Sequence, residues 1–199
     1  MTHAVRIVLP LILAGLSLPA HAHLVQTGFG KFYDGVVHLG MTPSDLLIVV
    51  AMALLAGLRG SRASRLCVLT LPVAWFVGGL IGARWPALGS IDWLTIVPFA
   101  LTGALVALDA RIRDAALQAL AVAAGLIHGL VNGATMDPEG TGLLALAGAV
   151  SAVVFIALLL AAEVSRLPDG WPRVTVRALG SWITATGMLM FGWMLHAAR

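Results

Sequence analysis

The chain alternates between long apolar runs and short polar linkers, and this pattern predicts helices that cross a membrane. A spanning helix needs about 17 to 25 mostly apolar residues, because it rises only about 1.5 Å per residue. Six runs of that length follow residue 41, and the linkers between them hold most of the charge. The predicted spans are residues 42–58, 64–83, 91–108, 114–134, 142–162 and 175–197.

Polar residues at the start of two of these runs indicate where their helices begin. Thr42 offers a cap residue, Pro43 suits a first helical turn, and Asp45 places an acid near the positive helix end. Asp114 can cap the fourth spanning helix in the same way.

Residues 1–22 have the three parts of a secretory signal peptide. Arg6 lies in a short polar start, an apolar stretch follows, and Ala20-His21-Ala22 matches an A-x-A cleavage site. Cleavage there makes His23 the first residue of the mature chain, while an uncleaved anchor helix is the alternative. Residues 23–199 are then expected to form a single transmembrane helical domain, with residues 23–41 as an extracytoplasmic segment.

The composition supports the membrane reading and excludes several classes. Of the 199 residues, 60% are hydrophobic and 11% are charged, whereas soluble domains carry about 25% charged residues. This excludes a soluble globular protein, a disordered chain and a protein that binds nucleic acid. Cys67 is the one cysteine, so neither a disulfide within the chain nor a thiolate metal site is expected. The predicted fold class is an all-α, polytopic membrane helix bundle with about six transmembrane helices.

Basic residues predict how the bundle is oriented, because they gather in cytoplasmic loops. With a cleaved signal peptide and six spans, both mature termini lie outside a bacterial-type inner membrane. Three basic residues then lie outside, namely Lys31, Arg84 and Arg199. Eight lie in cytoplasmic loops, namely Arg59, Arg62, Arg65, Arg111, Arg113, Arg166, Arg173 and Arg177.

The same topology gathers the mature histidines at the outer side of the bundle. They are His23, His38, His128 and His196. His128 and Asn132 are one helical turn apart and share a face. A ridge of small residues beside them (Gly125, Gly129 and Gly133) lets a neighbouring helix approach closely, so the pair is expected to point into the bundle. The alternative is that the pair only joins two helices by hydrogen bonds.

Histidine and carboxylate together at an outer opening suit a divalent transition metal. Imidazole nitrogen favours nickel, copper, zinc or cobalt, and a carboxylate compensates the charge. The candidate metal-binding residues are His23, His38, Asp45, His128 and Asn132. His23 and His38 could instead belong to a solvated segment. No resident cofactor is predicted; the metal is expected as substrate or ligand.

Other candidate chemistry is weaker. Met188, Met190 and Met194 are best read as packing or lipid-facing side chains. Trp75 and the other tryptophans mostly flank helix ends and are interpreted as an aromatic belt. The sequence has no glycine-rich phosphate loop, nucleophile elbow or HExxH motif, so an enzyme is not expected.

Two stretches resemble the HupE/UreJ family of hydrogenase and urease accessory membrane proteins, which are regarded as nickel permeases. The first is residues 28–38, running into Asp45. The second is Ile127-His128-Gly129-Leu130-Val131-Asn132-Gly133-Ala134-Thr135, which is similar to the family pattern Phe-His-Gly-x-Ala/Val-His-Gly-x-Glu. The chain departs from the two motifs at three positions, where Leu46 and Asn132 replace histidine and Thr135 replaces glutamate. Asp137 and Glu139, just beyond, could supply the missing charge.

The resemblance implies uptake of a metal cation for nickel enzymes, with the lipid bilayer and metalloenzyme maturation proteins as partners. Three readings follow. The chain is a permease for nickel or a related divalent ion, with an outer-face His/Asp site where the cation enters. It is alternatively a metal-binding or assembly factor that does not transport. A membrane enzyme that uses a bound metal is the weakest reading, because no general-base arrangement beyond His128 and the outer acids is visible.

Overall fold

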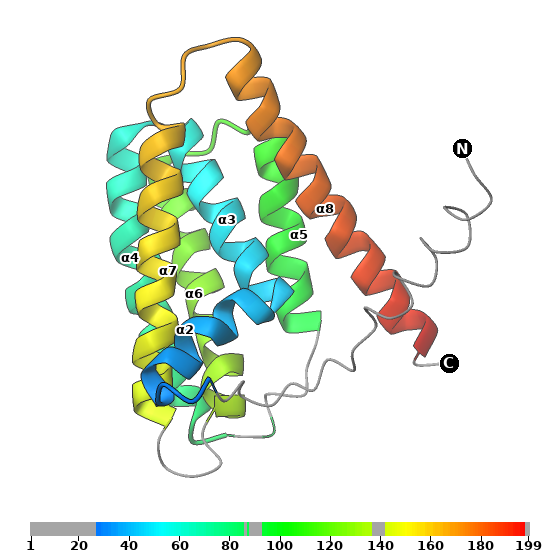
Figure 1. Cartoon of the computed structure of the whole chain (residues 1–199). Helices are drawn as coiled ribbons and strands as arrows, with labels where there is room; N and C mark the ends of the chain where they lie inside the picture. Colours follow the sequence, from blue (N-terminus) through cyan, green and yellow to red (C-terminus); the bar gives the residue numbers. More distant parts are fainter. Residues whose placement is uncertain (1–26, 86, 88–92, 137–141, 198–199) are drawn as a thin grey trace, which may run out of the picture.

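The computed structural model describes residues 27–85, 87, 93–136 and 142–197, and the regular elements in these ranges form a helical bundle (Figure 1). The signal-peptide segment, His23, Asp137 and Glu139 lie outside the described residues. The helices of the described part are α2 (Lys31–Met41), α3 (Pro43–Leu58), α4 (Ser61–Gly82), α5 (Trp93–Ala107), α6 (Asp114–Met136), α7 (Gly142–Val164) and α8 (Trp171–Ala197).

The apolar helices are those of a multi-pass membrane protein. Within the described residues, α4, α6, α7 and α8 are each long and apolar enough to cross a bilayer. Helices α2 and α3 meet that test only together, as a pair bent by 77°. Helix α5 has 15 residues and is shorter than the other candidates. All six predicted helices are present, but the predicted count of six membrane spans is not confirmed.

Helix α2 is an element that the sequence analysis did not predict, because its residues were assigned only to an extracytoplasmic segment. It lies obliquely across α7 at one end of the bundle (Figure 1). The two backbones touch because glycine stands at each close approach. A Cβ on Gly35 would overlap the carbonyl of Ala145, and a Cβ on Gly148 would overlap the carbonyl of Phe32. Tertiary packing therefore stabilises an 11-residue helix that would be marginal alone.

The break between α2 and α3 follows from Pro43. Proline disfavours a helical conformation in the residue before it, and Thr42 is extended, with φ −104° and ψ 98°. Pro43 then occupies the first turn of α3, where its missing N–H costs nothing. The break directs the first turn of α3, which contains Asp45, into the bundle, where Asp45 is buried.

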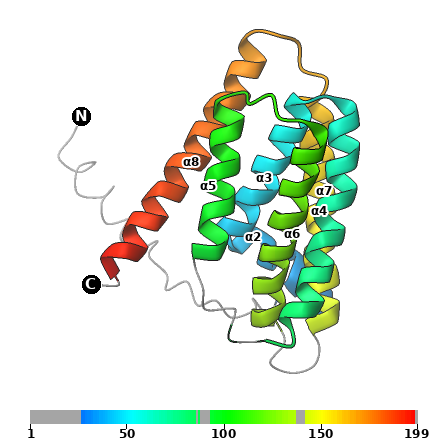
Figure 2. The same ribbon diagram turned by 180° about the vertical axis from the view of Figure 1, so that it is seen from behind.

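Helices α4 and α6 form the most extensive helix pair, and they lie side by side in Figure 2. The glycine ridge of α6 faces the backbone of α4, as expected: a Cβ on Gly129 would overlap the carbonyl of Trp75, and one on Gly133 would overlap that of Gly79. Helix α4 also has glycines at this contact, because Gly78 and Gly82 face carbonyls of α6. Backbone contact on both sides fixes the position of α6 relative to α4.

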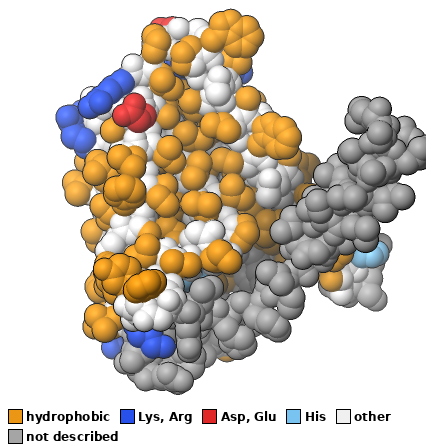
Figure 3. All heavy atoms as spheres, viewed as in Figure 1, with side chains coloured by type: hydrophobic (Ala, Val, Ile, Leu, Met, Phe, Trp, Pro, Cys, Tyr) orange, Lys and Arg blue, Asp and Glu red, His pale blue; other side chains and the backbone are white. Residues whose placement is uncertain are grey.

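Helix α8 packs against α5 and diverges from the other helices toward its C-terminal end (Figure 1). Its contact with α5 again uses small residues, with Gly103 on α5 facing Gly180 and Ile183 on α8. Hydrophobic side chains cover the flank of the bundle seen in Figure 3. Many of these are large and exposed, which suits a surface surrounded by lipid.

The end of the bundle opposite α2 is held by an ion-pair network. Asp109, in the turn after α5, forms ion pairs with Arg59 and with Arg173. Asp109 has φ +47°, a conformation that aspartate tolerates better than most residues. The network joins the α3–α4 turn, the end of α5 and the start of α8.

Candidate functional site

A polar centre lies in the interior of the bundle, where α3 and α6 meet. Asp45 comes from the first turn of α3, and His128 and Asn132 come from successive turns of α6. Their residue exposures are 1%, 0% and 2%, respectively. Buried polar groups of this kind need partners, and in membrane helices they tend to mark function.

Asp45 holds both α6 side chains. His128 Nδ1 lies 2.7 Å from Asp45 Oδ1, and Asn132 Nδ2 donates to Asp45 Oδ2 at 2.6 Å. An ionised carboxylate only accepts hydrogen bonds, so with Asp45 ionised the His128 contact places a hydrogen on Nδ1. In the neutral imidazole, Nε2 is then the unprotonated nitrogen with a free lone pair.

The opposite atoms of the same two side chains have no hydrogen-bond partner among the described residues. His128 Nε2 and Asn132 Oδ1 are buried without a hydrogen bond from the described residues. Leaving a buried polar atom unsatisfied costs about 1 to 3 kcal/mol. An imidazole nitrogen lone pair and an amide oxygen are both atoms that can bind a cation, so each is a candidate ligand.

Trp75 packs against this centre from α4. Its ring centroid lies 5.4 Å from that of His128, with the planes tilted by 34°. Trp75 is 0% exposed, so its assignment to an interfacial aromatic belt is wrong. Its Nε1 is a further buried atom without a partner in the described residues. The sequence does contain a signal that Trp75 is buried: Gly78, Gly79 and Gly82 share its face of α4, and glycines on one face indicate close helix packing.

The polar centre lies well inside the length of α6, a helix long and apolar enough to cross a bilayer. His128 is 14 residues after the start of α6 at Asp114, which at 1.5 Å per residue is about 21 Å along the helix axis. The hydrocarbon core of a bilayer is about 30 Å thick. A position about 21 Å along a helix that crosses such a core lies within the thickness of the core.

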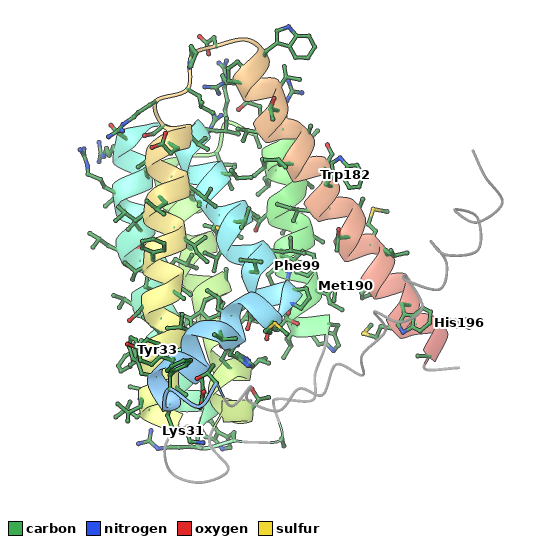
Figure 4. The ribbon with its side chains drawn as sticks, in the orientation of Figure 1. Lys31, Tyr33, Phe99, Trp182, Met190 and His196 are labelled. Carbon is green, nitrogen blue, oxygen red and sulfur yellow. The ribbon has the colours of Figure 1, made fainter. Side chains whose placement is uncertain are left out.

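Of the other predicted ligands, His38 is among the described residues and His23 is not. His38 is buried on α2, where its Nε2 lies 3.4 Å from the Thr42 hydroxyl. Among the described residues, no group of three or more His, Cys, Asp or Glu side chains is placed to hold a metal ion. His196 is exposed near the end of α8, on the part of that helix that diverges from the bundle (Figure 4).

The structure also shows the surroundings of the three positions where the family motifs carry stronger ligands. Leu46 follows Asp45 and is half-buried. The Thr135 hydroxyl donates to the carbonyls of Val131 and Asn132, each at 3.1 Å, so it is engaged within its own helix. Asn132 is the one of the three replacements that contributes a polar atom to the centre.

The comparisons with known proteins identify the family of the chain. Neither a curated protein nor a solved structure matches the chain. The family model described as HupE / UreJ protein matches residues 11–190, which is most of the chain and includes α2 to α7 and most of α8. This chain belongs to the HupE/UreJ family.

Proposed function

We propose that this chain is a membrane permease for nickel or a related divalent transition-metal cation. Its family consists of metal-handling accessory or permease-like membrane proteins, and this membership supports the proposal. The break between α2 and α3 supports it as well. Broken helices at membrane depth commonly form substrate sites in transporters, because unwound backbone and helix ends can contact an ion there.

The observation that carries the proposal is the pair of unpartnered atoms, His128 Nε2 and Asn132 Oδ1. Histidines that bind a metal almost always donate their other ring N–H to a carboxylate or carbonyl, which fixes the tautomer and the ring orientation. Asp45 has this relation to His128. We assign His128 Nε2 and Asn132 Oδ1 as cation ligands, and Asp45 as the group that orients them and compensates the charge.

A weak ligand set suits transport, because a cation that crosses the membrane must also leave the site. An imidazole and an amide oxygen bind less tightly than the two imidazoles of the family motif. Water can complete the coordination of a cation that passes through. His38 and His23 remain candidates for earlier contacts with the cation on its way to the centre.

The alternative function is a metal-binding or metalloenzyme assembly accessory that does not transport. One observation favours it: the described residues do not bring three strong metal ligands together. A protein of this kind would hold the cation, or a maturation partner, at one face of the membrane.

Uptake of radioactive nickel by cells that express the chain tests the proposal. We expect uptake above that of cells without the chain, and we expect His128→Ala to abolish the excess. His196→Ala is the matched control, because this histidine is exposed on α8 and forms no hydrogen bond with Asp45, and it should leave uptake unchanged. Binding of nickel by the purified parent chain without uptake in cells would favour the accessory function. Neither binding nor uptake of nickel, cobalt, copper or zinc would overturn both functions.

A further inference from the structure

A second candidate site lies between α4 and α7, at the opposite end of the bundle from α2. A groove of about 470 Å³ opens there. Ser61, Arg65, Ser165 and Arg166 are among the residues that line its polar part. The groove continues along the bundle over apolar side chains, which include Val68, Leu69 and Leu158. Figure 3 shows the same arrangement, with basic side chains gathered at this end of α4 and α7 above a hydrophobic flank.

The two arginines of the groove are available to a ligand. Within the described part of the chain, neither Arg65 nor Arg166 forms an ion pair, and both are exposed. Of the other arginines at this end, Arg59, Arg62 and Arg173 each pair with an aspartate. One carboxylate is nearby in the sequence: Glu163 is exposed on α7, three residues before Arg166, but it does not line the groove.

The remaining polar groups of the groove leave it positive. The Ser64 hydroxyl donates to the carbonyls of Gly60 and Ala161, and the Ser165 hydroxyl donates to the carbonyl of Ala162. Helix α4 begins at Ser61, so its first turn presents unpaired N–H groups and the positive end of its dipole here. Two free guanidinium groups beside a helix N-terminus form a site for a phosphate group.

We propose that this groove binds an anionic phospholipid, with its phosphate between Arg65 and Arg166 and an acyl chain along Val68, Leu69 and Leu158. The apolar continuation selects a lipid over a free phosphate ion, because the ion would leave that wall uncovered. Basic pockets between transmembrane helices on the cytoplasmic side commonly bind anionic headgroups. The groove lies at the end of the bundle that the basic residues predict to be cytoplasmic. The proposal does not depend on whether the chain transports a metal.

Native mass spectrometry of the full chain, purified in detergent, tests the proposal. Phosphatidylglycerol, phosphatidylcholine and inorganic phosphate are added in separate titrations. We expect phosphatidylglycerol to bind more tightly than phosphatidylcholine, and inorganic phosphate to compete only weakly. The double variant Arg65→Gln/Arg166→Gln should lower phosphatidylglycerol affinity at least about tenfold. Arg62→Gln is the matched control, because Arg62 is exposed on the same helix but does not line the groove.

Each arm of the experiment can overturn the proposal. The proposal is wrong if the double variant and the Arg62→Gln control bind phosphatidylglycerol with equal affinity. It is also wrong if the parent chain binds phosphatidylglycerol and phosphatidylcholine equally well. Inorganic phosphate that binds as tightly as the lipid would show a site for a free anion instead. Leu158→Ser tests the acyl-chain wall separately, since this exposed side chain contributes little to the core. We expect it to weaken lipid binding severalfold without changing the binding of inorganic phosphate, and an unchanged lipid affinity contradicts the assigned chain position.

Discussion

His128 Nδ1 lies 2.7 Å from Asp45 Oδ1, although 83 positions separate the two residues in the sequence. The contact joins the first turn of α3 to the C-terminal half of α6. It also determines which nitrogen of His128 is available, because the ring nitrogen next to the carboxylate carries the hydrogen when Asp45 is ionised. Asp45 is therefore the residue through which the rest of the polar centre is oriented.

Asp45→Asn should lower nickel affinity about 10- to 100-fold, the effect that loss of an outer-shell partner typically has on a metal site. The amide keeps the size of the side chain but removes the negative charge that compensates the cation. Isothermal titration of the purified variant with nickel measures the change. Asp34→Asn is the control, because Asp34 is also a buried acid, but its carboxylate accepts hydrogen bonds from Thr27 on the far side of α2 from the break. Equal losses in the two variants would indicate a general effect of removing a buried charge.

Asn132→His should raise nickel affinity about tenfold or more, because imidazole is a stronger ligand than an amide oxygen for this metal. The substitution restores the residue that the family motif carries at this position. Gln118→His is the control: it adds a histidine to the same helix at a site where the native side chain bonds Thr70 instead. If Asn132→His binds nickel no better than Gln118→His, position 132 does not contact the cation.

Most helices could be predicted from the sequence because their signals are local. The 42–58 run corresponds to α3 and the 114–134 run to α6, with ends that differ by one or two residues. Apolar length decides that such a run is a helix, and Pro43 and Asp114 mark where the two helices begin. Helix α2 has neither a long apolar run nor a residue that marks its start. It is short and contains Asp34 and His38, and its stability comes from contact with α7 through Gly35 and Gly148, which are far apart in the chain.

The polar centre could be predicted only in part, for the same reason. The i,i+4 spacing of His128 and Asn132 beside the glycine ridge is a local pattern, and it indicated that they point into the bundle. The contact of Asp45 with that pair depends on how α3 packs against α6, which the sequence does not specify. His38 was also expected near the pair; it is buried in the last turn of α2, beside the break, where its Nε2 lies 3.4 Å from the Thr42 hydroxyl.

The predicted orientation can be tested with single cysteines in a Cys67→Ala background. Arg62→Cys and Arg111→Cys should resist a membrane-impermeant maleimide added to intact cells, and both should react after the cells are lysed. Tyr33→Cys is the control that should be labelled in intact cells, since Tyr33 is exposed near Lys31 at the other end of the bundle (Figure 4). Labelling of position 62 or 111 in intact cells would show that the basic end faces outward.

The α4–α6 contact should be sensitive to a single methyl group. Gly129→Ala adds a Cβ that overlaps the carbonyl of Trp75, and such overpacking typically costs about 1 to 3 kcal/mol. We expect a lower melting temperature for the variant in detergent. Gly192→Ala is the control, because a Cβ there meets nothing within 4 Å, and alanine is the better helix former. A melting temperature for Gly129→Ala equal to that of Gly192→Ala would mean that the two backbones are farther apart than this contact requires.

Asp109 should contribute to stability in two separable ways, through its ion pairs and through its backbone conformation. Asp109→Asn keeps a residue that tolerates φ +47° but removes the partner of Arg59 and Arg173. Asp109→Ala removes the charge as well and adds backbone strain of about 1 to 2 kcal/mol. Arg59 is largely buried, so loss of its partner is costly. Melting temperatures should therefore fall in the order parent, Asn variant, Ala variant. Arg62→Ala, which breaks the exposed pair with Asp114, should melt close to the parent. Equal melting temperatures for the Asn and Ala variants would show that the positive φ contributes nothing, and a parent-like Asn variant would show the same for the ion pairs.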